Sequence, residues 1–279
     1  MTEFPRTLVG GVSLPRLIVG TNWFLGYSHT SSAKDKFIQA YQNRGSIAEI
    51  LTVFVESGVD AVLGSSPLLS EAIQEAQDRT GRKIIQMLTP QFNILPGGPA
   101  ETEPERALDV CRKLGATFCL PHQCVTDALI DRMHKEIRDM DKYSRMIRER
   151  GMIPGLSTHM PEAVVIADDT NVDVETYIQL YNSAGFMMQV EVDWVMRIIK
   201  NARKPVLTIK PLAAGRLLPP VGLAFVWNTI RDQDMVAIGT TTPDEAREVI
   251  DLSLDFLNRR LPENQLQTTR SKQSLRTSS

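Results

Sequence analysis

Short apolar runs alternate with longer amphipathic stretches along most of this chain of 279 residues. The runs are rich in valine, isoleucine and leucine, and glycines or polar loops end them, which is typical of buried strands. The stretches between them have the spacing of helices that cover a core. The predicted strands cover 17–19, 61–63, 83–88, 117–120, 153–156, 176–180, 206–209 and 235–238.

Helix start and stop signals separate these strands. The clearest is Thr242 with Glu245 three residues later, a capping box with Pro243 at the first helical position. Capping boxes of the same type begin at 46 and 102, and glycines at 58 and 115 end the helices that follow them. The other predicted helices cover 71–79 (capped by Ser70), 130–150, 161–168, 190–201 and 219–230.

Strands that alternate with helices in this way predict a single (β/α)8 TIM barrel. The barrel domain is expected over 1–258, with an N-terminal β-hairpin whose turn is Gly10-Gly11 lying over its bottom. The segment 89–101 holds three prolines and two glycines, so we expect it to cross one face of the barrel. Residues 259–279 form a polar tail that we expect to be mobile.

Composition excludes some classes of function. The formal charge is −2 and there is no block of lysine and arginine, which argues against nucleic-acid or membrane-surface binding. There is no signal peptide and no apolar run of membrane length. Three cysteines suit free thiols in a reducing compartment, so a cytoplasmic protein is expected. Association with further copies of the chain is left open.

Three of the four histidines, His29, His122 and His159, lie at predicted C-terminal strand ends. In a TIM barrel these ends form one bowl, so residues far apart in the sequence can converge there. Three imidazoles with an open fourth position would suit Zn²⁺ or another divalent ion. The alternative is that they line a pocket and act singly as acids or bases. Cys124 follows His122 closely enough to lie on the same side.

Lys210 ends the predicted strand 206–209. A lysine at a barrel mouth can pair with an anionic substrate, form a Schiff base after losing its proton, or extend into solvent. We favour pairing with a phosphate or carboxylate. Nearby, the loop 22–29 carries aromatic and polar groups, including Trp23 and Tyr27, that would form either a ligand wall or a hydrophobic plug.

Small residues follow the last two predicted strands. They would let backbone N–H groups approach a phosphate closely, beside the N-terminus of the last helix. Alternatively, they merely permit tight turns. The candidate phosphate-binding residues are Gly215, Arg216, Gly239, Thr240, Thr241 and Thr242.

Five local strings resemble the aldo/keto reductase family in the right order. They lie at 6–21, 155–157, 179–182, 211–215 and 238–245, and the resemblance spans about 6–256. It implies a TIM barrel and an NADP-type cofactor. Gln179 would hold the nicotinamide amide, and Ser157, at the matching end of the fifth strand, would help to hold the cofactor. The small loop residues just named would hold the pyrophosphate and the ribose-phosphate arm.

The catalytic residues of that family are not matched, apart from one. Leu63 stands at or next to its aspartate position, no tyrosine follows, and Leu88-Thr89-Pro90 replaces its lysine. Only His122 matches. Ile209 also replaces a stacking tyrosine, and Glu248-Val249 replaces a Glu-Asn pair, which puts an adenine contact in doubt. The ordinary reductase mechanism is therefore disfavoured.

Our leading hypothesis is an enzyme that acts on a small phosphorylated or carboxylated ligand at the C-terminal mouth. Lys210, Arg216 and 239–242 would bind the anion, and His122 and His159 would supply acid/base chemistry or, with His29, bind a metal. A lyase, isomerase or aldolase type of step fits this arrangement. The alternatives are an NAD(P)H-dependent oxidoreductase with an altered tetrad and a non-catalytic ligand-binding barrel.

Overall fold

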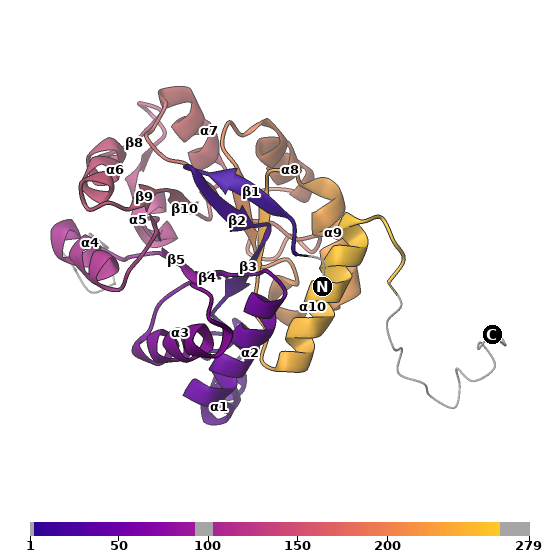
Figure 1. Cartoon of the computed structure of the whole chain (residues 1–279). Helices are drawn as coiled ribbons and strands as arrows, with labels where there is room; N and C mark the ends of the chain where they lie inside the picture. Colours follow the sequence, from indigo (N-terminus) through magenta and orange to yellow (C-terminus); the bar gives the residue numbers. More distant parts are fainter. Residues whose placement is uncertain (1–2, 93–102, 263–279) are drawn as a thin grey trace.

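A computed structural model describes residues 3–92 and 103–262. Its main sheet is parallel and closes into a barrel that the helices surround (Figure 1). The TIM barrel with an N-terminal hairpin is therefore confirmed. The strands in chain order are β1 (Arg6–Val9), β2 (Val12–Pro15), β3 (Leu17–Gly20), β4 (Ala61–Leu63), β5 (Ile85–Leu88), β6 (Phe118–Cys119), β7 (Ile130–Asp131), β8 (Glu136–Ile137), β9 (Ile153–Pro154), β10 (Leu156–Thr158), β11 (Tyr177–Leu180), β12 (Val206–Ile209) and β13 (Met235–Ile238).

The helices follow the strands on the outside of the barrel. The last of them, α10, begins as predicted, because the Thr242 hydroxyl accepts the Glu245 N–H at 3.1 Å. The helices are α1 (Ser32–Tyr41), α2 (Arg44–Glu56), α3 (Pro67–Thr80), α4 (Pro104–Lys113), α5 (Gln123–Thr126), α6 (Met140–Glu149), α7 (Glu162–Thr170), α8 (Val192–Asn201), α9 (Pro219–Thr229) and α10 (Pro243–Leu257). None of these helices, which span the described residues, is long and apolar enough to cross a membrane.

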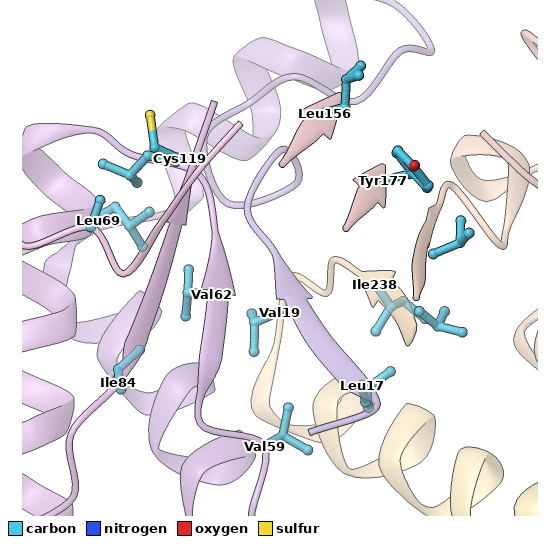
Figure 2. Close-up of a cluster of buried hydrophobic side chains, with 14 of the residues drawn as sticks. Leu17, Val19, Val59, Val62, Leu69, Ile84, Cys119, Leu156, Tyr177 and Ile238 are labelled. Carbon is cyan, nitrogen blue, oxygen red and sulfur yellow. The ribbon is translucent and has the colours of Figure 1, made fainter. Parts of the chain in front are cut away.

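The hairpin β1–β2 covers the N-terminal end of the barrel. Its turn residues Gly10 and Gly11 both have positive φ, as a two-residue hairpin turn of this kind requires. Val9 and Leu14 belong to the same buried cluster as the inward-facing strand residues Ile18, Ile178 and Leu207. A second cluster fills the layer between sheet and helices, and Figure 2 shows part of it around Val19, Val62 and Tyr177.

Closure of the barrel depends on a break in the fifth barrel strand. Its first half, β9, pairs with β6, and its second half, β10, pairs with β11. Gly155 lies between the halves. A Cβ at this position would meet Leu120 Cδ2 at 2.5 Å and Thr176 Cγ2 at 3.0 Å. Only a residue without a side chain lets the strand bend between these two neighbours.

The predicted helix 130–150 is wrong over its first ten positions. Residues there form the hairpin β7–β8, and α6 begins only at Met140. The Asp131 carboxylate accepts the N–H groups of Met133 and His134, both at 3.0 Å, and so stabilises a turn. A side chain that hydrogen-bonds to its own backbone in this way competes with a helix.

Two helix caps also differ from the prediction. In α2 the reciprocal capping box is made by Asn43 and Ser46, so the helix begins earlier than a Ser46–Glu49 box would allow. In α3 the cap is Ser66, whose hydroxyl accepts the Leu69 N–H at 3.0 Å, and not Ser70. Residue 102, most of the loop 89–101 and the tail beyond 262 lie outside the described residues.

Replacing Gly155 with alanine should destabilise the fold by about 1–3 kcal/mol, as overpacking of a filled interior does. Leu120 is fully buried and cannot move aside freely. Chemical denaturation would measure the change, with Gly45→Ala in α2 as the matched control. The double variant Gly155→Ala/Leu120→Ala should lose less than the two single changes together. Unchanged stability of Gly155→Ala would contradict the steric argument.

Candidate functional site

A cavity of about 670 Å³ opens at the C-terminal end of the barrel strands. His29, His122, His159 and Lys210 all line it, as the strand-end argument predicted. They follow β3, β6, β10 and β12, so four different strands deliver them. Of the predicted cofactor residues, Ser157, Gly215, Gly239, Thr240 and Thr241 also line this cavity.

Lys210 is held at the cavity by a strained turn. It has a φ of 59°, a left-handed conformation that costs a residue with a side chain roughly 1–2 kcal/mol. Its carbonyl accepts the Ala213 N–H at 2.9 Å, and Ala213 and Ala214 also have positive φ. Strain of this kind persists where surrounding structure enforces it, often at functional sites.

The Lys210 side chain is half-buried and its ammonium is unpaired. Burial lowers its pKa to about 8. Within the described residues it has no ion-pair or hydrogen-bond partner. A buried, unpaired charge is unfavourable, and a negative group brought beside it would relieve that cost. The Lys210 ammonium itself therefore lacks a negative partner.

The three imidazoles surround this positive charge and stay neutral. Burial lowers the pKa of His159 to about 4, with further contributions from Lys210, His122 and His29. Burial and then Lys210 lower the pKa of His122 and of His29 in the same way, although Asp35 opposes the effect at His29. Because each ring responds to Lys210, the four groups act as one electrostatic unit.

The tautomer of His122 follows from its contacts with Cys124. The Cys124 backbone N–H donates to His122 Nδ1 at 3.3 Å, and Cys124 Sγ lies 2.9 Å from the same nitrogen. A backbone N–H can only donate, so Nδ1 carries the lone pair. Burial raises the pKa of the Cys124 thiol, which keeps it a donor as well. The ring proton is therefore on Nε2, the nitrogen left for the cavity.

His159 is positioned through its backbone. Its N–H donates to Asp127 Oδ2 at 3.1 Å, and the Thr158 hydroxyl donates to the same carboxylate. Among the described residues, no hydrogen-bond partner occupies the His159 ring. A neutral imidazole with a free nitrogen in a cavity can accept a proton from a ligand.

The predicted metal site is not formed. No group of three or more His, Cys, Asp or Glu side chains in 3–92 and 103–262 is arranged to hold a metal ion. The His122 tautomer also directs a proton, rather than a lone pair, from Nε2 into the cavity. The hypothesis of Zn²⁺ on His29, His122 and His159 is therefore corrected to three imidazoles around a lysine.

Three predicted cofactor residues do not line the cavity. Gln179 alternates with the inward-facing Ile178, so its side chain points to the helix side of β11, where Oε1 has no hydrogen-bond partner. Arg216 stacks on Phe186 at 3.9 Å. Thr242 serves as the N-cap of α10. These positions were assigned from sequence strings, which do not say which way a side chain faces.

The predicted anion cradle is taken by side chains of the chain itself. Glu245 Oε2 accepts the Thr241 N–H at 2.6 Å and the Thr241 hydroxyl at 2.8 Å. The Trp23 indole packs against Gly215 and Gly239: a Cβ built on either glycine would lie 3.6 Å or less from its ring carbons. In this arrangement the Thr241 donors are paired with Glu245, and the side chain next to both glycines is Trp23.

Asn22 lines the cavity as part of the loop 22–29, which was expected to form a ligand wall or a plug, whereas Lys34 was not predicted from the sequence. Asn22 Nδ2 lies 3.3 Å from His29 Nε2, and Lys34 Nζ lies 5.9 Å from the centre of the Trp23 ring. Lys34 belongs to α1, a helix that the strand–helix alternation did not indicate. The serine-capped start of that helix was the available signal, since the Ser31 hydroxyl accepts the Lys34 N–H.

No protein-family model and no curated protein sequence matches the chain. Solved structures do match. A protein from Pseudomonas aeruginosa assigned as an aldo-keto reductase has a TM-score of 0.65 at 13% identity, over 90% of this chain and 95% of that chain. The fold is that of the aldo-keto reductases.

Two further structures with the aldo-keto reductase fold are similar to the chain. One is an aldo-keto reductase from Klebsiella pneumoniae in complex with NADPH, with a TM-score of 0.55 and 17% identity over 94% and 92% of the two chains. The other is aldose reductase from Giardia lamblia, with a TM-score of 0.54 and 11% identity over 94% and 90%. At sequence identities this low, the similarity shows a shared barrel fold and does not show a shared chemistry.

Replacing Lys210 with methionine should stabilise the protein at pH 7. A pKa lowered from 10.5 to about 8 corresponds to at most roughly 3 kcal/mol, and solvent at the cavity mouth reduces the expected gain to about 1–2 kcal/mol. The gain should be present below pH 8 and disappear as the pH rises to 10.5, where the amine is neutral in both folded and unfolded states. Urea unfolding across this pH range would measure it.

Lys200→Met on α8 is the control for the loss of one exposed lysine. The pKa of His159 should rise in the Lys210 variant, because one of the charges that depress it is gone. A loss of stability in Lys210→Met at pH 7 would mean that the ammonium has a stabilising partner.

Replacing Cys124 should change the His122 tautomer. In the wild type and in Cys124→Ser, which keeps a donor, ¹⁵N NMR of the imidazole should show a proton on Nε2 and none on Nδ1. Cys124→Val removes the thiol donor and should give a mixture of tautomers. A proton on Nδ1 in the wild type would contradict the contacts with Cys124.

Proposed function

We propose that the protein is an enzyme that acts on a small ligand carrying a carboxylate or a phosphate. The observation that supports this most directly is the half-buried Lys210 ammonium, which faces three neutral imidazoles in one cavity. An anionic group beside Lys210 would compensate its charge. Such a ligand is favoured because the free site already bears the cost of the unpaired charge.

His159 is the proposed proton acceptor. Its ring is neutral and unpaired within the described residues, and the depressed pKa makes it a weak base in the free protein. A bound anion would screen the positive charge of Lys210 and raise the pKa of His159 toward its ordinary value. Ligand binding would thus strengthen the base at the moment it is needed.

His122 is the proposed hydrogen-bond donor. Its Nε2–H would stabilise negative charge that develops on a ligand oxygen after a proton leaves the neighbouring carbon. Lys210 would attract the same charge. Removal of a proton next to a carbonyl is the first step of many isomerase and lyase reactions, and it requires no group beyond these three side chains. We therefore place the reaction in that class.

The nicotinamide-dependent reductase has less support. NADPH is present in the Klebsiella pneumoniae structure, and Ser157 lines the cavity of this chain. However, Gln179 faces away from the cavity, and Trp23 and Glu245 occupy the loops that would hold the cofactor arm. A non-catalytic barrel would explain the anion site but gives no role to the free His159 ring.

The proposal is tested by incubating the full chain in D₂O with a panel of small oxo-carboxylates and sugar phosphates. NMR should show exchange of a carbon-bound proton in at least one of them. His159→Gln should slow that exchange by about 100-fold or more, as loss of a catalytic base does. It should leave ligand affinity within a few-fold of the wild type.

Lys210→Met should abolish saturable binding of the same ligand, and Lys200→Met should leave it unchanged. Binding without exchange for every ligand would identify a non-catalytic barrel. Ligand affinities that are equal in the wild type and in Lys210→Met would overturn the anion site itself.

A further inference from the structure

Trp23 lies across the two loops that follow β12 and β13. A Cβ on Gly239 would be 3.1 Å from Trp23 Cδ1, and a Cβ on Gly215 would be 3.6 Å from both Cζ2 and Cη2. One edge of the indole thus contacts the loop after β13, and the other edge contacts the loop after β12. Gly215 and Gly239 have no side chain, so another group can lie close to the loops, and that group is the Trp23 indole.

The turn that carries Trp23 is well fixed. The Leu25 N–H donates to the Thr21 carbonyl at 3.1 Å, and the Tyr27 N–H donates to the Asn22 carbonyl at 2.8 Å. Phe24, the next residue, is fully buried among the core side chains. Moving the indole away from the glycines therefore requires a change in an anchored turn or an unfavourable rotamer.

Glu245 takes the donors at the start of α10. Both the N–H and the hydroxyl of Thr241 are donated to its carboxylate. Asp244 and Glu248 lie on the same end of the helix, and Glu248 lines the cavity. Arg247 is paired with Asp244 at 2.7 Å. A phosphate at the start of α10 would find both Thr241 donors already paired with Glu245. It would also lie beside at least two carboxylates, those of Glu245 and Glu248.

A phosphate held by backbone N–H groups needs its oxygens about 2.9 Å from the nitrogens. The Trp23 ring carbons lie 3.1–3.6 Å from where a Cβ on Gly239 or Gly215 would stand, so a phosphate on these loops would have to share this space with the indole or displace it. Electrostatic repulsion from Glu245 and Glu248 acts in the same direction for a pyrophosphate or a ribose phosphate. Trp23 opposes a phosphate on these loops sterically, and Glu245 and Glu248 oppose it electrostatically.

We infer that Trp23 and Glu245 exclude the phosphates of a dinucleotide from the loops after β12 and β13, and that the part of the cavity at Lys210 takes a compact anion with a single phosphate or one or two carboxylates. The exclusion stands on the contacts of Trp23 and Glu245 alone. The compact ligand rests on the function proposed above. Trp23 is then a specificity-determining residue, which covers the side of the cavity where the aldo-keto reductase fold would extend toward a cofactor arm.

Calorimetric titration of the full chain with NADPH and with NADH tests the exclusion. Wild-type protein should show no saturable binding up to about 1 mM. The variant Trp23→Ala/Glu245→Gln should gain at least about tenfold in NADPH affinity, and each single variant should gain less. Trp194→Ala on α8 is the matched control, because this tryptophan is exposed and does not line the cavity.

Wild-type binding of NADPH with a Kd below about 0.1 mM would overturn the inference. So would a folded double variant that binds no better than the wild type. Trp23→Phe keeps an aromatic ring of smaller area, so it tests the same point if the alanine variant does not fold, and its NADPH affinity should lie between those of the wild type and the double variant.

Inorganic phosphate and malonate, titrated into the same samples, separate the two ideas. Binding of either that Lys210→Met abolishes supports the compact anion. If phosphate, malonate and the dinucleotides all fail to bind, the hypothesis of an anion site at Lys210 is rejected. The exclusion of dinucleotides by Trp23 and Glu245 then still stands. If NADPH binds wild-type protein, the exclusion fails whatever happens with phosphate.

Discussion

The cavity depends on closure of the parallel strands into a ring. β13 pairs with β3 through Val236 and Leu17, and the bent strand at Gly155 joins β6 to β11 on the opposite side. Closure brings the C-terminal strand ends together, which is why His29 and Lys210 share one cavity although they are distant in the sequence. The inner apolar cluster and the hairpin fill the other end of the barrel, and the cavity opens at the C-terminal mouth.

Within that mouth, the chain accepts an unfavourable charge. The Lys210 ammonium is half-buried and unpaired, its backbone is strained, and the nearby imidazoles stay neutral because of their own burial and, second, because of its charge. A site that only served stability would pair or expose such a lysine. Functional sites commonly keep an interaction unsatisfied until the ligand supplies the missing partner. His159 is neutral because it is buried and lies near the charge of Lys210. His122 carries its proton on Nε2 because Cys124 donates to its Nδ1.

The barrel shares the aldo-keto reductase fold, and side chains of the chain itself lie against the loops after its last two strands. Glycines and a capped helix remain at the ends of β12 and β13, but they contact Trp23 and Glu245. The local sequence thus resembles a cofactor-binding loop, while the contacts in the structure are with Trp23 and Glu245. A fold can preserve its loops and change what they hold, because a glycine specifies only that something approaches closely.

The alternation of apolar runs and helix caps was enough to predict the barrel and its hairpin, and the strand-end rule was enough to bring three histidines and Lys210 together. Tertiary structure decided the rest. Strands buried on both faces have no polar alternation, so the outward direction of Gln179 could not be read from its neighbours. The turn at Asp131 competed with a helix that the pattern allowed. Which group lies against Gly215 and Gly239 depends on a tryptophan about 200 positions away, and only the closed barrel places it there.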